Sequence, residues 1–533
     1  MAPRIGSDKD LSFKFTRPQD AENLAEQQIG IPLSSSLTRQ YWPQSYERSM
    51  DLYSRSPSSE TGKSFLQQLK QHDNQQRKDL SVHKSERKIS EAEVPLLNND
   101  ATHTIEDRAI EEGFQVDDFQ PAFQHHFQST NHGPEQGHSS FISAVLNGVN
   151  ILAGVGILSM PYAVSQGGWA GLCCLLTFAA VCCYTGVLLR RCLDLHPRVS
   201  GYPDVGQAAF GRLGRLVVSG LLYCELFAVA IEFLILEGDN LSQLISFNGV
   251  NLGFFRLSSE KSFVILSAAV MLPTVWLRDL SMLSYLSAGG VLACLVVLFA
   301  VVWTGIFEVG FTNHGKLLNL QGFPIAVGLY AFCYCGHAVF PNIYGSMREK
   351  GKFSQVLIVC FIVCTLIYGG IAVLGFLMFG DDIKSQVTLN LPRGRPATKV
   401  AIVATLVNPF AKYALTVAPL AAALEELLPL GLKAIAFVAW GTTIRTLLVV
   451  TTVVIALTVP FFAYLMALIG SFLSTTVAIT IPCLCYLKLF SGRIPLWERL
   501  LIYVFLAIGL CACIAGTYSS ILEIAKGLYS TAA

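Results

Sequence analysis

The sequence predicts an all-α membrane protein, and three observations support this prediction. Of its 533 residues, 52% are hydrophobic and 14% are charged, and the mean hydropathy is +0.50, which is typical of integral membrane proteins. Eleven apolar runs of about the length needed to span a bilayer follow residue 138. The first run carries Gly154-Val155-Gly156 at its centre and Pro161 shortly after, so we expect its helix to break inside the membrane.

The segment 1–138 differs in composition from the rest of the chain. It holds 15 Lys/Arg and 21 Asp/Glu residues and no apolar run of spanning length. A segment of this kind cannot bury enough apolar surface to fold alone, and it lacks the pattern of a cleaved signal peptide. We therefore expect residues 1–138 to form a disordered cytosolic tail and residues 139–533 to form the transmembrane domain.

The expected spans follow one another over the transmembrane domain. They are 141–165, 169–193, 216–238, 262–277, 281–306, 323–345, 354–379, 399–424, 446–468, 470–489 and 499–524. A further apolar stretch, 429–441, is too short to span and is expected to lie at the membrane interface. With the tail in the cytosol, the inner connections hold fourteen Lys/Arg residues and the outer ones eight, which favours this orientation.

The break in the first run indicates a cavity. Glycine weakens a helix by about 1 kcal/mol and proline by about 3 kcal/mol. Backbone groups freed at mid-membrane depth persist only where water, protein or a bound solute satisfies them. The alternative is a kinked helix that packs against its neighbours through small residues.

The sixth run repeats the outline of the first. Gly148, Gly156 and Pro161 are matched, at one constant offset along the chain, by Gly328, Gly336 and Pro341. Each span carries the chain to the other side of the membrane. The sixth run lies five runs after the first, an odd number, so the two interrupted runs enter the membrane from opposite sides. Inverted repeats with paired broken segments are the sequence signature of a secondary transporter site.

Such a break is chemically suited to an amino acid. The half-helix that begins near Gly156 presents N–H groups and the positive end of its dipole to a carboxylate. Carbonyl groups freed before the break can accept hydrogen bonds from an ammonium group or bind a cation. The opposite wall is expected to come from Phe332, Cys333, Tyr334 and His337.

Four ionisable residues lie at depth inside the expected spans. An intramembrane charge costs at least about 2.5 kcal/mol and usually has a partner or a task. Glu225 and Glu232 share one helix face in the third run, His337 lies in the sixth-run break, and Lys412 lies near mid-membrane in the eighth run. We expect at least one of them to couple transport to protons, with a hydrogen-bonded packing role as the alternative for His337.

Lys412 has two possible roles. Its ammonium group can take the place of a sodium ion between the first and eighth spans, with Asn150 and Thr416 as neighbours. Alternatively, it forms a structural ion pair with Glu225 or Glu232. The first role would favour protons over sodium as the coupling ion.

The cysteines indicate neither a disulfide framework nor a metal site. All 15 lie in the transmembrane domain, mostly inside apolar runs, where cysteine behaves as a small hydrophobic residue. The three C-x-C pairs lack the additional His or Cys ligands that a zinc site requires. We expect no cofactor other than the proton gradient.

Five separated motifs resemble one known family. They are NGVNILAGVGILSMPYAVSQGGW in the first run, YPDVGQAAFG (202–211), EFLILEGDNL (232–241), YCGHAVFPNIY (334–344) and NPFAKYALT (408–416). Together they resemble the plant vacuolar amino acid transporter family, which belongs to the amino acid/auxin permease group of the amino acid-polyamine-organocation superfamily. The resemblance covers about residues 139–525 and implies a LeuT-like fold of two inverted five-helix repeats plus an eleventh transmembrane helix.

The resemblance also implies a function and a site. It implies secondary transport of neutral amino acids, usually coupled to protons, in the tonoplast or alternatively the plasma membrane. Substrate and cation contacts implied by the family motifs fall on Asn150, Ala153, Gly154, Val155, Gly156, Tyr334, Gly336 and His337. Sodium-coupled relatives carry a hydroxyl-bearing residue near the position of Lys412, so the lysine argues against sodium coupling.

The sequence thus favours a monomeric carrier that works by alternating access, with an amino acid substrate and the lipid bilayer as its partners. The alternative is a membrane sensor that binds an amino acid and signals through its tail. A channel is disfavoured because no ring of charges or repeated carbonyl filter is visible. No nucleophile–base motif, phosphate-binding loop or nucleic-acid-binding pattern indicates an enzyme or a nucleic-acid partner.

Overall fold

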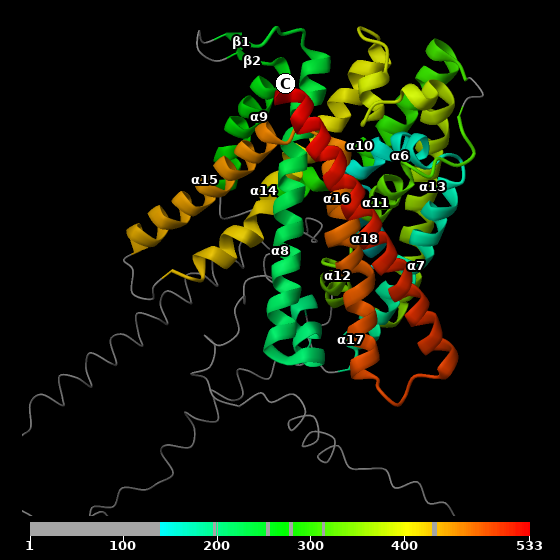
Figure 1. The fold of residues 1–533 in the computed structure, drawn as a ribbon. Coiled ribbons are helices and arrows are strands. Elements are labelled where there is room, and N and C mark those ends of the chain that lie inside the picture. The colour runs from blue at the N-terminus through cyan, green and yellow to red at the C-terminus, as the bar shows by residue number, and fades with distance from the viewer. Residues whose placement is uncertain are drawn as a thin grey trace, which may run out of the picture.

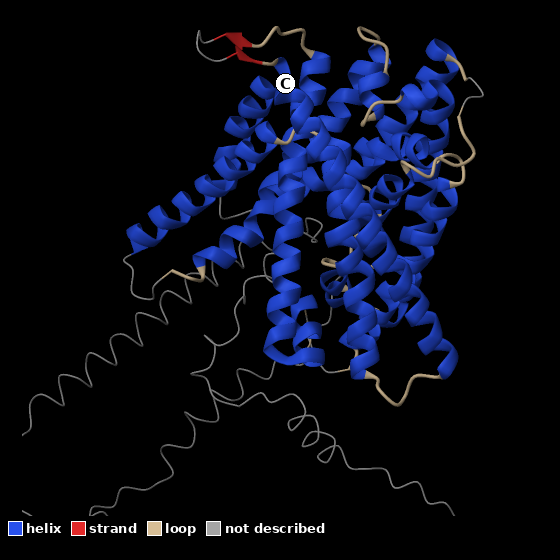
Figure 2. Cartoon of the chain, in the orientation of Figure 1, coloured by secondary structure: helices blue, strands red, loops and turns tan. Residues whose placement is uncertain are grey.

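The computed structural model describes residues 139–195, 199, 201–251, 256–276, 281–311, 315–428 and 434–532. Within these ranges the chain is almost entirely helical, and its strands are β1 (Val250–Asn251) and β2 (Arg256–Leu257), a short antiparallel pair (Figures 1 and 2). The end of the bundle that carries β1, β2 and the C-terminus is the upper face, and the opposite end is the lower face. The expected tail, residues 1–138, lies outside the described residues.

The helices follow one another as long rods joined by short connections. The first group is α5 (Phe141–Leu152), η3 (Val155–Ser159), α6 (Met160–Gly167), α7 (Gly171–Leu193), α8 (Tyr202–Leu244), α9 (Ser259–Trp276), α10 (Ser281–Thr304) and η4 (Gly305–Val309). The second group is α11 (Phe323–Cys333), α12 (Phe340–Ser346), η5 (Lys350–Lys352), α13 (Phe353–Phe379), η6 (Gly380–Asp382), η7 (Val387–Asn390), α14 (Pro396–Glu425), α15 (Ala434–Thr458), α16 (Phe462–Ile469), η8 (Gly470–Ser474), η9 (Thr476–Thr480), α17 (Ile481–Leu489) and α18 (Leu496–Ala532).

Eight of the described helical segments are long and apolar enough to cross a membrane, or nine if the bent pair of α5 with η3–α6 counts as one span. The two other expected runs correspond to α9 and to α11–α12. Helix α9 has 18 residues, whereas α11 is apolar but has only 11 residues. The protein is therefore an all-helical, multi-span membrane protein.

The expected boundary between the ninth run (446–468) and the tenth run (470–489) is wrong. Helix α15 already begins at Ala434 and ends at Thr458, and the next helix begins at Phe462. Pro460 lies in the gap, and proline disfavours helix at the preceding residue and lacks the N–H that continues one. The stretch 429–441 was expected to lie at the membrane interface. Its described part, from Ala434 onward, is instead the start of α15.

Helix α8 is the longest in the first half, with 43 residues, and it bears most of the buried acidic side chains. It kinks at Gly211, whose φ of 67° lies in the left-handed region that glycine adopts without a steric penalty. An ion pair between Asp204 and Arg215 bridges the kink. Beyond it, α8 runs to the upper face, where β1 follows (Figure 1).

Helix α11 is held close to η8 by two glycines. A Cβ atom on Gly470 would lie 1.9 Å from the carbonyl oxygen of Gly328, and one on Gly328 would lie 2.4 Å from that of Ala467. Only small residues allow two membrane helices to approach this closely. The contact fixes the position of α11, which leads into the second interrupted segment.

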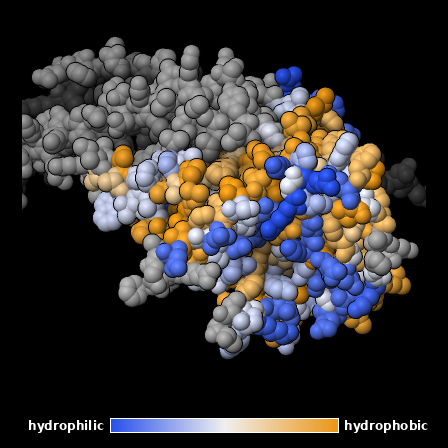
Figure 3. Space-filling model, turned by 90° about the horizontal axis from the view of Figure 1, so that it is seen from above, coloured by the Kyte–Doolittle hydropathy of each residue, from blue (hydrophilic) through white to orange (hydrophobic). Residues whose placement is uncertain are grey.

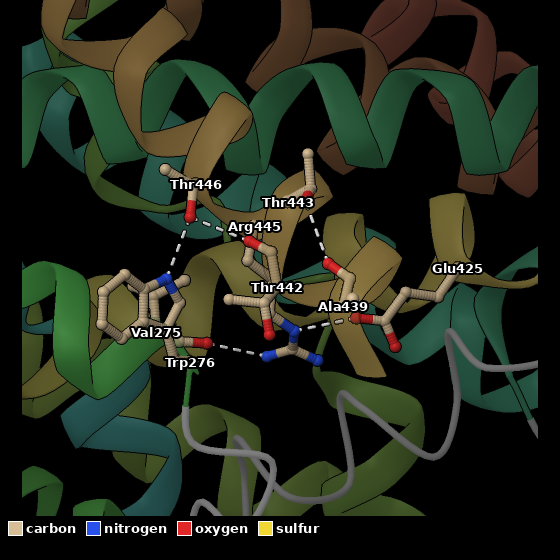
Figure 4. A network of polar contacts seen from close by, with 8 residues as sticks. All are labelled: Val275, Trp276, Glu425, Ala439, Thr442, Thr443, Arg445 and Thr446. Carbon is tan, nitrogen blue, oxygen red and sulfur yellow. Dashed lines mark hydrogen bonds and ion pairs between the residues drawn. The ribbon is translucent and has the colours of Figure 1, made fainter. Parts of the chain in front are cut away.

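A polar cluster joins the ends of α9 and α14 to the middle of α15. Arg445 on α15 donates from Nε to Glu425 on α14 (2.8 Å) and from Nη1 to the carbonyl of Val275 on α9 (2.9 Å) (Figure 4). Beside it, Trp276 Nε1 donates to Thr446 Oγ1 at 3.0 Å. The side chains of Arg445 and Glu425 are only 8% and 12% exposed, so the pair is largely withdrawn from water.

The surface has the polarity expected of a membrane protein. Seen from above, hydrophilic residues gather in patches on the upper face, and hydrophobic residues lie beside them (Figure 3). Large apolar side chains are exposed on the sides of the bundle, including Phe299 on α10 and Leu366 on α13 (69% and 71% exposed). Exposure of this kind is stable in contact with lipid.

Candidate functional site

The first expected span is broken where the sequence predicts. Helix α5 ends at Leu152, Ala153 and Gly154 are not helical, and η3 leads into α6, with a bend of 50° between the two parts. Pro161 lies in the first turn of α6, where its missing N–H has no intrahelical partner to lose. Gly154 is extended, with φ of −98° and ψ of −157°.

Three carbonyl groups before and at this break accept hydrogen bonds from side chains of other helices. The carbonyl of Asn150 accepts from Lys412 Nζ on α14 at 2.9 Å, and that of Ala153 accepts from Cys294 Sγ on α10 at 3.2 Å. The carbonyl of Leu152 accepts from the Tyr368 hydroxyl on α13. Protein side chains thus occupy positions that the sequence analysis assigned to an ammonium group or a cation.

The second break separates α11, which ends at Cys333, from α12, which begins at Phe340. It lies directly against the first. A Cβ on Gly156 would meet Cys333 Sγ at 2.5 Å, and one on Gly336 would meet the Leu152 side chain at 3.1 Å. The glycines therefore allow the two interrupted segments to touch.

Tyr368 bridges the two breaks. Its hydroxyl group lies within hydrogen-bonding distance of both the Leu152 carbonyl and the Cys333 carbonyl, the latter at 3.2 Å. The side chain is completely buried. A hydroxyl has a single proton, so the two carbonyls share one donor.

Replacing Tyr368 with phenylalanine should reduce amino acid uptake about tenfold. The substitution keeps the ring but leaves two buried carbonyls without their shared donor, at a cost of about 1–3 kcal/mol. Tyr503→Phe on α18 is the matched control, because that side chain is 52% exposed. Equal uptake by both variants, measured in liposomes at equal protein content, would show that Tyr368 does not hold the breaks together.

Both breaks line one cavity of about 120 Å³. This volume exceeds the roughly 10–15 Å³ needed for one water molecule several times over. The breaks contribute Ile151, Leu152, Gly154, Val155 and Gly156 from the first segment and Phe332, Cys333, Cys335, Gly336, Ala338 and Val339 from the second. The remaining wall comes from Glu225, Leu226, Val229 and Phe233 on α8, from Asn408, Lys412 and Thr416 on α14, and from Ser474 on η8.

Most of the residues predicted to form the site meet at this cavity. Among the substrate-contact predictions, Gly154, Val155, Gly156, Phe332 and Gly336 line it. Among the coupling predictions, Glu225, Lys412 and Thr416 line it. Asn150 and Glu232 do not, although Asn150 reaches Lys412 through its carbonyl.

Three predicted substrate contacts point elsewhere. His337 Nε2 lies 3.0 Å from Thr185 Oγ1 on α7, so the alternative of a hydrogen-bonded packing role fits its position. The Tyr334 hydroxyl pairs with Thr365 on α13 at 2.8 Å, and its ring stacks on Phe361. Ala153 is buried but does not line the cavity. A motif match locates a residue along the chain, but it does not determine which way the side chain points once the helix is interrupted.

Lys412 and Glu225 place one potential cation and one potential anion on the cavity wall. Ser474 Oγ donates to Glu225 at 2.6 Å, and the Thr416 hydroxyl donates to the main-chain carbonyl of Lys412 at 2.9 Å. The ion pairs among the described residues do not join Lys412 to Glu225 or Glu232, so the structural ion pair is absent from this conformation.

Three residues that shape the site are not among the predicted site residues. Tyr368 and Cys294 satisfy carbonyls of the first break, and Ser474 holds the Glu225 carboxyl group. None of them belongs to a pattern that distinguishes it from other tyrosines, cysteines and serines in apolar spans. Ser474 lies at the end of η8, a stretch of π-helix, a local geometry that often marks functional sites.

An all-helical bundle with several spans, and a cavity between two interrupted helices whose wall includes Glu225 and Lys412, defines a membrane transport protein. Comparison with known families agrees: residues 137–522 match the family described as transmembrane amino acid transporter protein. The chain belongs to this family. It is a transmembrane amino acid transporter rather than an enzyme, and an integral multi-pass membrane protein.

Individual relatives cover most of the chain. It is 40% identical to "Amino acid transporter AVT1B" of Arabidopsis thaliana over 530 residues, which cover 98% of this chain and 95% of the relative. It is 45% identical to "Amino acid transporter AVT1D" of the same plant over 399 residues, which cover 74% of this chain and 72% of the relative. The "Vesicular GABA transporter" of Caenorhabditis elegans is 26% identical over 447 residues, which cover 81% of this chain and 89% of the relative. The likeness to the vacuolar amino acid transporter family inferred from the five motifs is thereby confirmed.

Proposed function

We propose that the protein is a proton-coupled secondary transporter of neutral amino acids that works by alternating access. The observation that carries the proposal is the single cavity lined by both interrupted segments and by Glu225 and Lys412. The main chain around Gly154, Val155 and Gly156 would bind the carboxylate of the substrate, with Phe332 and Gly336 on the opposite wall. The family assignment favours transport over the alternative of a membrane sensor.

The composition of the wall supports a neutral substrate. One carboxyl group and one ammonium group line the cavity, and an amino acid zwitterion adds no net charge to them. The wall also includes the apolar side chains of Leu226, Val229 and Phe233. While Glu225 is ionised and Lys412 is protonated, a substrate with a charged side chain would leave one charge without a counter-charge at a site removed from water, which is unfavourable.

The pair of broken segments supports a LeuT-like arrangement of two inverted five-helix repeats plus an eleventh helix. The segments α5–α6 and α11–α12 hold the glycines and prolines that match at one constant offset, Gly156 with Gly336 and Pro161 with Pro341. Their breaks are in contact. In this proposal, the repeat that contains the breaks rocks against the rest of the bundle and exposes the cavity to each side in turn.

The hydrogen bond of Lys412 supports protons as the coupling ion. Its ammonium group lies on the Asn150 carbonyl, the place we assign to a sodium ion in sodium-coupled relatives, and Thr416 lies beside it. A fixed ammonium group would exclude sodium electrostatically. Glu225, the carboxyl group on the same cavity, would then carry the proton.

Replacing Lys412 with threonine tests this assignment. We expect proton-driven uptake to fall at least fivefold and stimulation by sodium to appear, because a hydroxyl group would replace the cation beside the Asn150 carbonyl. Lys526→Met is the matched control, since Lys526 forms an exposed ion pair with Glu523. Sodium-stimulated uptake by the unmodified protein at constant pH would contradict the proposal.

We further propose that the protein is a monomer in the tonoplast with its N-terminal tail in the cytosol, with the plasma membrane as the alternative. The lower face would then be the cytosolic side. Fluorescent fusions at each terminus, with quenching from the cytosolic side, test both the membrane and the orientation. A cytosolic C-terminus would contradict the expected odd number of spans.

Counterflow in proteoliposomes tests the central claim. A panel of radiolabelled amino acids should show saturable counterflow for neutral members, and an imposed pH gradient should drive their accumulation. Binding without flux, or accumulation driven only by sodium, would overturn the proposed function. Counterflow confined to acidic or basic amino acids would overturn the substrate class.

A further inference from the structure

One face of α8 carries acidic residues at every seventh position. Glu225, Glu232 and Asp239 are separated by seven residues each, which returns a helix to within about 20° of the same direction and advances it by about 10.5 Å. The three carboxyl groups therefore form a row along one side of α8. This row is called the carboxyl ladder below.

The two ends of the carboxyl ladder lie in different surroundings. Glu225 lines the cavity and accepts a hydrogen bond from Ser474 at 2.6 Å. Asp239 lies near the upper end of α8, is only partly buried, and accepts a hydrogen bond from Gln386 Nε2 at 2.9 Å. Gln386 in turn accepts from Asn240 at 2.6 Å and belongs to the connection between η6 and η7.

The middle member, Glu232, is completely buried, and neither of its carboxyl oxygens has a hydrogen-bond partner within the described part of the chain. An ionised carboxylate in this position is costly, so the group needs a proton or an internal water molecule. It lies beside the end of α11, within electrostatic reach of the Cys333 thiol. Glu232 therefore occupies the stretch between the cavity and the upper face.

We propose that the carboxyl ladder is the proton path of this transporter, with Asp239 as its entrance from the upper face and Glu225 as its end at the cavity. This inference rests on the proposed proton-coupled function. In each step an O–H bond breaks at one carboxyl group and forms at the next, through internal water, so one proton moves and no electrons are exchanged. The proton gradient across the membrane supplies the driving force.

Among the residues that the structure describes, few other charged or titratable groups face the carboxyl ladder. Glu260 on α9 lies within electrostatic reach of Asp239, and Lys412 on α14 shares the cavity with Glu225. Near Glu225, the Cys335 thiol is within hydrogen-bonding reach. Glu237 on α8 is fully buried, with both oxygens unpartnered in the described residues, but its helical direction differs from that of the ladder. Gln386 is uncharged and holds Asp239 in place.

The decisive variant is Asp239→Asn, because Asp239 lies outside the cavity. In proteoliposomes, counterflow of the best neutral amino acid from the panel should stay within about twofold of the unmodified protein. Accumulation driven by an imposed pH gradient should fall at least fivefold, and entrapped pyranine should no longer report proton movement coupled to the amino acid. Asp381→Asn is the matched control, since Asp381 is an exposed acidic residue near the same face.

A second variant tests whether the groups act in series. Glu232→Gln should lose gradient-driven accumulation as Asp239→Asn does, and the double variant should be no worse than either single one. Gradient-driven accumulation by Asp239→Asn at the level of the unmodified protein would overturn the carboxyl ladder. The carboxyl ladder would also be overturned if Asp239→Asn lost counterflow and accumulation to the same extent while Asp381→Asn kept both. That pattern would indicate a structural role for Asp239.

The result for the unmodified protein separates this inference from the proposed function. If it shows counterflow but no response to a pH gradient, proton coupling itself fails and the ladder fails with it. If it responds to the gradient while Asp239→Asn responds equally well, only the ladder fails.

Discussion

Replacing Gly156 with alanine is expected to lower the efficiency of amino acid uptake about a hundredfold. The new Cβ would lie 2.5 Å from Cys333 Sγ and 3.4 Å from the Phe332 ring, between two segments that already touch. Overpacking of this kind costs about 1–3 kcal/mol, and we expect the upper end of that range because all three residues line the cavity. Uptake kinetics in proteoliposomes measure the effect.

Gly220→Ala is the matched control for Gly156→Ala. Gly220 lies on α8, and a Cβ atom there would meet nothing within 4 Å, so uptake should be unchanged. Both variants should reach the membrane in equal amounts. If Gly156→Ala transports as well as Gly220→Ala, the contact between the two breaks is not where the substrate binds.

Replacing Arg445 with methionine is expected to destabilise the folded protein by about 3–5 kcal/mol, the usual cost of removing one partner of a buried ion pair. The change leaves Glu425, which is only 12% exposed, without its partner and removes the donor to the Val275 carbonyl. The ends of α9 and α14 should then separate more easily from the middle of α15. Thermal unfolding in a fixed detergent measures the loss.

Arg493→Met serves as the control for Arg445→Met, because Arg493 is exposed in the connection after α17. The double variant Arg445→Met/Glu425→Leu should recover part of the lost stability, since it removes the uncompensated charge. If Arg445→Met unfolds at the same temperature as Arg493→Met, the cluster in Figure 4 does not hold the three helices together.

The periodicity and composition of the sequence were sufficient for the class of fold. Apolar runs located most of the helices to within a few residues, and Gly154, Gly156 and Pro161 located the first break. These signals are local: glycine and proline weaken a helix wherever they occur, and an apolar run must be buried or face lipid. The five motifs were likewise enough to assign the family, since they lie within residues 137–522.

Some segment boundaries needed the structure. The stretch from Ala434 to Gly441 would be too short to span if it ended there, yet it continues into α15. The end of α15 is decided by Pro460, which interrupts a run that is apolar on both sides. Hydropathy averaged over a window cannot place such a break, because the residues around it are equally apolar.

The sequence by itself determined that two interrupted helices exist and that Glu225, Glu232, His337 and Lys412 are buried, although it missed Glu237 and Arg445. Only the tertiary structure decided which of those residues share the cavity: Glu225 and Lys412 do, whereas His337 turns toward Thr185 on α7. The direction of a side chain at a helix break depends on contacts with segments that are distant in the chain, such as the contact of the Tyr368 hydroxyl with both breaks. No local pattern encodes such contacts, because they form only when the helices pack.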